Sequence, residues 1–127
     1  MKKLLLIGLV SFFSVSAFSQ SENKTEAVSF NVVKYNFGKI KQNVPKSYVF
    51  EMKNNGTKPL IIEQATAQCG CTTPEYSKKA ILKNKISPIK VTYNAANPGP
   101  FTKTVTIKFL NIAEPTILTI EGEVVGK

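Results

Sequence analysis

The sequence predicts an all-β sandwich, and three observations support this fold class. Apolar and polar residues alternate in several short segments, which is the period of a half-buried strand. Clusters of Gly, Pro and Asn separate these segments at regular intervals. No window places apolar residues at helical spacing. We therefore expect about six or seven short strands, whose apolar faces pack against each other in two layers.

The start of the chain has the three parts of a secretory signal peptide. Lys2 and Lys3 precede the apolar run LLLIGLVSFF, and Ala17 and Ser19 place small residues at the −3 and −1 positions of a cleavage site. The apolar run is about half as long as the roughly 20 residues that a spanning helix needs. We therefore expect cleavage after Ser19 and export to the periplasm or the cell exterior, with no transmembrane segment in the mature chain.

Three parts are expected along the chain: a signal peptide (1–19), a flexible lead-in (20–27) and one domain (28–127). The formal net charge is +9, and removal of Lys2 and Lys3 leaves about +7. The lysines are scattered singly or in pairs, and the aromatic residues lie on the apolar strand faces rather than between them. This pattern indicates a solvated surface and no nucleic-acid partner.

The first predicted strand covers residues 28–37 and contains a slip in its apolar phase. Phe30 and Val32 share one face, whereas from Val33 onward the apolar positions are shifted by one residue. Such a slip indicates a bulge or a strand that crosses between sheets. Phe37-Gly38 is expected to begin a turn.

The later strands follow the same alternation. Their apolar positions are Tyr48, Phe50 and Met52, then Ile89, Val91 and Tyr93, then Val105, Ile107 and Phe109, and finally Leu118, Ile120 and Val124. Leu60 opens another strand, which runs toward the cysteines. Asn54-Asn55-Gly56 predicts a turn, Asn97-Pro98-Gly99-Pro100 predicts a break, and Gly122 indicates a bulge.

The missing residue types exclude several functions. The chain has no Arg, Asp, His or Trp, so a Ser-His-Asp or Cys-His arrangement cannot be assembled, and a His-based zinc or copper site is equally excluded. Glu121 and Glu123 share one strand face, and we interpret this carboxylate pair as solvated rather than hydrolytic.

The segment Cys69-Gly70-Cys71-Thr72-Thr73-Pro74 holds both cysteines of the chain. A disulfide between them is feasible, because two residues of extended strand span about 6.6 Å, near the limit of about 6.8 Å for bridged Cα atoms, and Gly70 can shorten the gap. Two thiolates could instead hold Cu(I). A structural zinc site wants four ligands, and the chain offers only these two thiols and the thioether of Met52, so zinc would need a second copy. The thiols could also serve packing alone. Thr72, Thr73 and Pro74 are expected to shape a loop beside the pair.

Four segments, in order, resemble the motifs of a known family. They are Tyr35-Asn36-Phe37-Gly38-Lys39-Ile40, the run from Phe50 to Leu60, the run from Cys69 to Tyr76, and the run from Asn97 to Thr104. Together they resemble the bacterial domain of unknown function 1573. The resemblance implies an exported immunoglobulin-like β-sandwich, similar to ASH and MSP-type domains, with no enzyme activity. One departure is the stretch 82–86, which replaces a Pro-Gly turn and in which Asn84 can supply the turn.

We therefore expect an exported, non-enzymatic immunoglobulin-like module that needs no cofactor and has a binding or structural role in the cell envelope. Its partner would be a protein or another envelope component, reached through loops or exposed strand edges. The alternative is a thiol-based role at Cys69 and Cys71, either redox exchange or Cu(I) binding.

Overall fold

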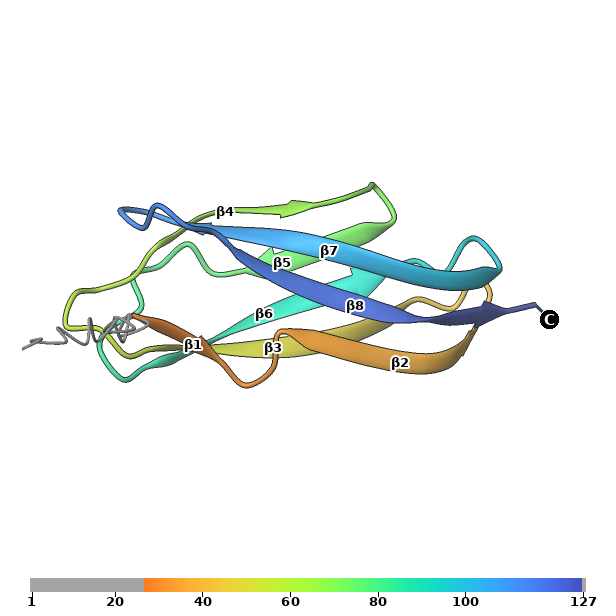
Figure 1. Ribbon diagram of the computed structural model, residues 1–127, viewed down its shortest axis with the longest axis horizontal. Helices are drawn as coiled ribbons and strands as arrows, with labels where there is room; N and C mark the ends of the chain where they lie inside the picture. Colours follow the sequence, from red (N-terminus) through yellow and green to blue (C-terminus); the bar gives the residue numbers. More distant parts are fainter. Residues whose placement is uncertain (1–26, 127) are drawn as a thin grey trace, which may run out of the picture.

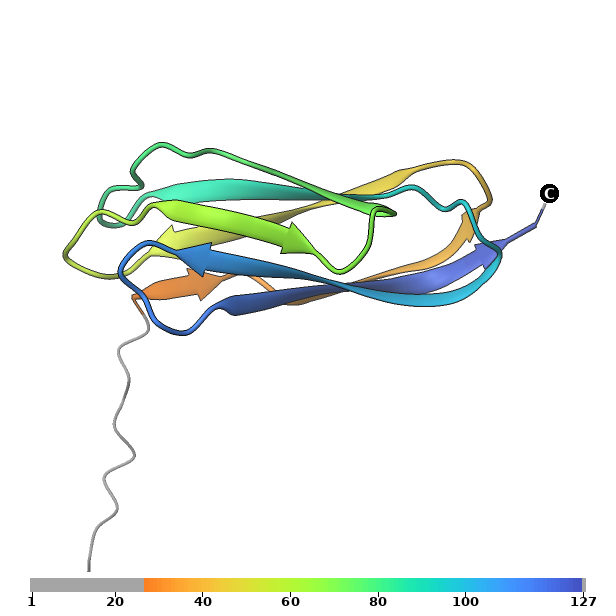
Figure 2. The same cartoon turned by 90° about the horizontal axis from the view of Figure 1, so that it is seen from above.

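The computed structural model describes residues 27–126, which form a two-layered β-sandwich without helices (Figures 1 and 2). Its eight strands are β1 (Val28–Phe30), β2 (Lys34–Lys41), β3 (Lys46–Asn54), β4 (Ile62–Ala67), β5 (Thr72–Tyr76), β6 (Ile86–Tyr93), β7 (Gly99–Phe109) and β8 (Thr116–Val125). The all-β prediction is confirmed. The predicted signal peptide and, apart from Ala27, the predicted lead-in lie outside the described residues.

Each sheet has four strands. The first sheet has the order β1-β3-β6-β5 and the second has the order β2-β8-β7-β4. All neighbours are antiparallel except β2 and β8, which are parallel. The edge strands β4 and β5 lie on the same side of the sandwich, and β1 and β2 lie on the other (Figure 1).

The predicted first strand is divided between the two sheets. β1 pairs with β3 in the first sheet, and β2 pairs with β8 in the second. The chain crosses between them at residues 31–33, where Val32 and Val33 are exposed. Of the two expected outcomes, a bulge or a crossing, the slip in apolar phase therefore marks a crossing. Because one predicted strand is divided in two, the structure has eight strands rather than six or seven.

The core consists of the inward-facing residues of both sheets. Phe50 and Met52 on β3, Ile89 on β6 and Ile107 on β7 are fully buried. Stacked aromatic rings bridge the two layers at one end. Tyr93 on β6 of the first sheet stacks on Phe101 on β7 of the second, with ring centroids 4.0 Å apart. Each large apolar side chain buried in this way contributes about 1.5–3 kcal/mol, so burial of the alternating residues is the main term that favours folding.

The expected turn at Phe37-Gly38 is wrong. β2 continues through these residues, and they form a bulge that opposes the single residue Gly122 on β8. Gly38 has a φ of 69°, which favours glycine, and its N–H donates to Oδ1 of Asn36 (2.7 Å). A Cβ on Gly122 would lie 2.8 Å from the carbonyl oxygen of Gly38, so the bulge requires glycine at both positions. The sequence signal at Gly122 thus reflects a bulge on the neighbouring strand.

Asn54 ends β3 as a fully buried polar residue. Its Nδ2 donates to the carbonyl oxygens of Lys58 and Ile81, both at 2.8 Å. Its Oδ1 accepts from the N–H of Gly56 at 2.9 Å. One side chain therefore closes the turn after β3 and connects that turn to the segment before β6. Such buried amides stabilise a fold only when all their groups are bonded, as they are here.

Asn84 forms the turn that leads into β6. Its φ is 63°, a left-handed conformation that Asn tolerates, and its N–H donates to the carbonyl of Asn54 at 2.7 Å. The interpretation that Asn84 replaces the Pro-Gly turn is confirmed. Within residues 27–126, the structure contains no helix long and apolar enough to cross a membrane.

Candidate interaction site at the β4–β5 crossing

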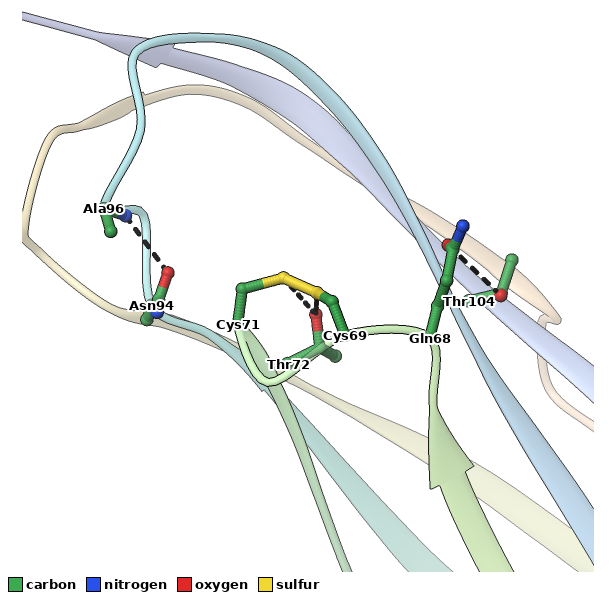
Figure 3. The surroundings of a disulfide bond; sticks show 7 residues. All are labelled: Gln68, Cys69, Cys71, Thr72, Asn94, Ala96 and Thr104. Carbon is green, nitrogen blue, oxygen red and sulfur yellow. Dashed lines mark hydrogen bonds between the residues drawn. A yellow bond between two sulfur atoms is a disulfide. The ribbon is translucent and has the colours of Figure 1, made fainter.

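The two cysteines lie where the chain passes from the second sheet to the first. β4 ends at Ala67 and β5 begins at Thr72, so four residues make the crossing. Cys69 and Cys71 form a disulfide, with their Cα atoms 5.3 Å apart (Figure 3). A turn at Gly70 brings them closer than an extended chain would, and φ of Gly70 is not positive. We call this crossing, Gln68–Cys71, the clip.

Main-chain hydrogen bonds fix the clip at both ends, and Figure 3 shows the side-chain bond between Gln68 and Thr104 that accompanies one of them. At one end the N–H of Gln68 donates to the carbonyl of Thr104 on β7 at 2.9 Å, and the Thr104 hydroxyl donates to the Gln68 side chain at 3.4 Å. At the other end the N–H of Asn94 donates to the carbonyl of Cys71 at 3.0 Å. The clip is therefore anchored to both sheets. Gln68, Asn94 and Thr104 were not predicted, because only the folded topology brings them to the cysteines.

Thr72 lies directly beneath the disulfide. Its Oγ1 is 3.9 Å from Sγ of Cys69 and 3.7 Å from Sγ of Cys71, and the residue is 4% exposed. The expectation that Thr72, Thr73 and Pro74 form a loop is wrong, because all three belong to β5. An edge strand accepts proline when the missing N–H would have faced away from its neighbour.

The outer side of the clip is open. A Cβ built on Gly70 meets no atom within 4 Å, and both cysteines are partly exposed. A larger side chain at position 70 would therefore not collide with the rest of the domain.

The main chain of β4 is also open on one side. In an antiparallel pair only every second residue forms hydrogen bonds with the neighbouring strand. Because the N–H of Gln68 bonds to Thr104 on β7, the residues of β4 that bond to β7 are Gln64 and Thr66. The N–H and C=O groups of Ala65 and Ala67 therefore point away from β7, where no strand lies among the described residues. We call the main chain of Gln64–Ala67 the open edge.

The structure also places the two other groups considered from the sequence, the thioether of Met52 and the carboxylate pair. Within the described residues no group of three Cys, His, Asp or Glu side chains could hold a metal ion, and Met52 is fully buried in the core. Glu121 lines a shallow hollow of about 450 Å³ at the β2 bulge, together with Glu123. Its carboxylate binds Lys34 at 3.0 Å, as expected of a solvated strand face.

The two four-stranded sheets define an immunoglobulin-like β-sandwich, a fold that the chain shares with PapD-like domains. The ASH / PapD-like domain of human CEP192 has a TM-score of 0.67 and 9% identity over 80% of this chain and 87% of that domain. The chain belongs to the family described as protein of unknown function (DUF1573), whose model matches residues 28–124. The resemblance read from the motifs is confirmed.

Two further solved structures share the fold. A protein of unknown function from Porphyromonas gingivalis W83 has a TM-score of 0.67 and 13% identity over 76% of this chain, which spans 46% of that protein. The YadV chaperone has a TM-score of 0.57 and 17% identity, with coverage of 79% of this chain and 53% of the chaperone. At these identities the likeness shows the fold alone. No curated protein matches the chain significantly.

Proposed function

We propose that this chain is an exported, non-enzymatic module that binds another protein in the bacterial cell envelope. The observation that carries the proposal is the clip, a short exposed crossing that a disulfide and bonds to both sheets hold in one conformation. A rigid segment loses little conformational entropy on binding, so it is well suited to recognition. The signal-peptide pattern supports export, and a disulfide suits an oxidising compartment.

Several features support protein binding over catalysis. The chain lacks the His and Asp that a Ser-His-Asp arrangement and other His-dependent sites need. One of its fold neighbours is a chaperone.

Gly70 allows a direct test of the clip. The mature chain, residues 20–127, would be immobilised and exposed to envelope extract, alongside Gly70→Trp and a control, Lys83→Trp. Trp at 70 points into open space and leaves the fold intact, but it obstructs a partner at the clip. Lys83 is exposed in the turn at the other end of β5 and β6, so its replacement tests for nonspecific effects of a bulky group.

We expect wild type and Lys83→Trp to retain the same protein and Gly70→Trp to lose it, with unchanged far-UV circular dichroism in all three. Equal retention by Gly70→Trp would disprove a role for the clip. If no protein is retained by any form, the binding function itself is wrong.

A second candidate function is thiol exchange or Cu(I) binding at Cys69 and Cys71. The observation that favours it is Thr72, whose buried hydroxyl lies near both sulfurs and is placed to donate to a thiolate when the disulfide is reduced. Thiol titration and mass measurement of protein from its native compartment would distinguish the states. Under the leading proposal, a variant with both cysteines replaced by serine should still bind the partner, more weakly, because the main-chain bonds from the clip to both sheets remain. Under this one it should lose exchange activity or Cu(I) affinity.

A further inference from the structure

We propose that the open edge of β4 pairs with the open edge of a second copy of this chain, antiparallel and centred on Thr66. The pairing joins the two four-stranded sheets that contain β4 into one continuous sheet. Self-association of this kind is a separate proposal from partner binding, because it uses the main chain of β4, and of the clip only Gln68 and Cys69 lie beside the second copy.

Two of the four edge strands have features that discourage pairing with another chain. β1 has only three residues. β2 carries the exposed lysines Lys34, Lys39 and Lys41 and is interrupted by the bulge at Gly38. Short length, lysines and bulges are the devices by which native sheets avoid joining edge to edge.

β5 is protected by proline. The N–H of Asn94 bonds to the carbonyl of Cys71, so every second residue from there, Thr73 and Glu75, bonds to β6. The main-chain groups of the residues that alternate with them point away from β6. The middle outward position is Pro74, which has no N–H to donate. A strand added to this edge would lack its central hydrogen bond.

The open edge has none of these devices. Between Gln64 and Ala67 there is no proline, no lysine and no other charged residue, although lysines occur throughout the chain. The single bulge of β4 precedes this segment, between Ile62 and Gln64. Unpaired N–H and C=O groups along a regular strand are a template for another strand.

This edge is complementary to itself. In an antiparallel pair centred on Thr66, Ala65 lies opposite Ala67 of the second copy, and vice versa. Both residues point their main-chain groups outward, so each of these two pairs forms two hydrogen bonds, about four in all. Thr66 lies opposite its own copy, a favourable cross-strand pair, and Gln64 lies opposite Gln68.

Charge and space also fit a second copy. Glu63 lies opposite Cys69 of the other chain in this register, so no two like charges meet. The paired segment ends before Leu60, whose main chain is already bonded to Ile81 at 2.9 Å and 2.7 Å. The small, half-buried side chains of Ala65 and Ala67 allow close approach on the inner face. The net positive charge of each copy opposes association, and added salt should therefore strengthen it.

Sedimentation velocity of the mature chain tests the proposal. The contact is smaller than a standard interface, so we expect the mean mass to rise toward that of a dimer above about 100 µM. In 0.5 M salt the Debye length falls to about 4–5 Å, which screens the repulsion between the two positively charged copies. The dimer should therefore form at lower protein concentrations in that salt. Ala65→Pro should remove the dimer, because proline has no N–H to donate to the second copy. The fold should remain, because the Ala65 N–H points away from β7 and makes no ladder bond within the chain. Thr73→Lys, an exposed change on β5, is the matched control and should leave the dimer unchanged.

A charge exchange at Thr66 tests the register. Thr66→Lys and Thr66→Glu each place like charges opposite one another and should each be monomeric at concentrations where wild type dimerises. An equimolar mixture should restore the dimer, because Lys then lies opposite Glu. Residue 66 meets itself only in the proposed register, so recovery in the mixture identifies it.

Three results would overturn the inference: a wild-type chain that stays monomeric at about 500 µM in 0.5 M salt, a dimer that persists in both Thr66 variants, or a dimer that Thr73→Lys abolishes. Partner capture through the clip by a strictly monomeric chain would overturn this inference alone. A dimer without partner capture would overturn only the proposed binding function.

Discussion

Replacing Asn54 by Asp exchanges one NH₂ group for oxygen in the most buried polar residue of the fold. The Nδ2 atom donates to the carbonyl oxygens of Lys58 and Ile81, at 2.8 Å each. In the Asn54→Asp variant an ionised carboxylate would face both oxygens and lose both hydrogen bonds, while the bond from Gly56 N–H remains available. Size and shape hardly change, so the effect isolates hydrogen bonding and charge.

The cost follows from the contacts. A buried carbonyl left without its donor costs about 1–3 kcal/mol, and an unpaired buried charge raises the total to about 3–5 kcal/mol. Burial and the two carbonyl oxygens raise the pKa of the introduced carboxyl above its ordinary value of about 3.9. The folded variant then binds more protons than the unfolded one, so its stability rises as pH falls through the raised pKa. Protonation restores one donor, and we expect recovery of about 1–2 kcal/mol at pH 4 relative to pH 7.

Urea unfolding followed by circular dichroism at pH 7 and pH 4 measures both effects. Asn55→Asp is the matched control, because it introduces the same charge at the next position, where the side chain is exposed and donates to the Ser29 hydroxyl at 2.7 Å. We expect the control to change stability by less than about 0.5 kcal/mol. A loss below about 1 kcal/mol in Asn54→Asp, or a loss that does not depend on pH, would refute this account of Asn54.

Three further changes test other contacts. Gly122→Ala should destabilise the fold by about 1–3 kcal/mol, because its Cβ would lie 3.0 Å from the Phe101 ring, whereas Gly70→Ala, with open space around it, should be nearly neutral in thermal unfolding. Thr72→Val should lower the reduction potential of the disulfide by about 30–60 mV in glutathione buffers, since a hydrogen bond to a thiolate contributes about 1.5–3 kcal/mol. Replacing both cysteines by serine should cost about 1.6 kcal/mol in urea unfolding, the chain-entropy value for a loop of about three residues.

Each of these has a contrary result. Equal melting temperatures for the two glycine variants would mean that the β2 bulge can move away from Gly122. A reduction potential unchanged in Thr72→Val would show that the hydroxyl does not donate to sulfur. A loss above about 3 kcal/mol in the serine variant would show that the disulfide does more than close a short loop.

The strands were predictable where alternation alone decides the fold. Phe50 and Met52, or Ile89 and Val91, are apolar at every second position and are buried as the pattern predicts. The crossing between β1 and β2 was also visible, because moving to the other sheet reverses which residues face inward and thereby shifts the apolar phase at Val33.

The errors arise where one residue type serves two geometries. Phe37-Gly38 indicates a turn from composition, but the same glycine conformation serves a bulge when the chain continues in register with β8. Pro74 indicates a loop, yet an edge strand accepts it when its nitrogen faces outward. The role of Asn54 and the anchors of the clip depend on contacts between residues far apart in sequence, which no local pattern contains.

The parallel pairing of β2 with β8 has a mechanical consequence. The described chain enters at one end of the long axis and leaves at the opposite end (Figures 1 and 2). Tension applied between these ends pulls β2 and β8 in opposite directions along their length. Because their hydrogen bonds lie across that direction, they bear the load together rather than opening one after another. The domain should therefore resist stretching between its two ends.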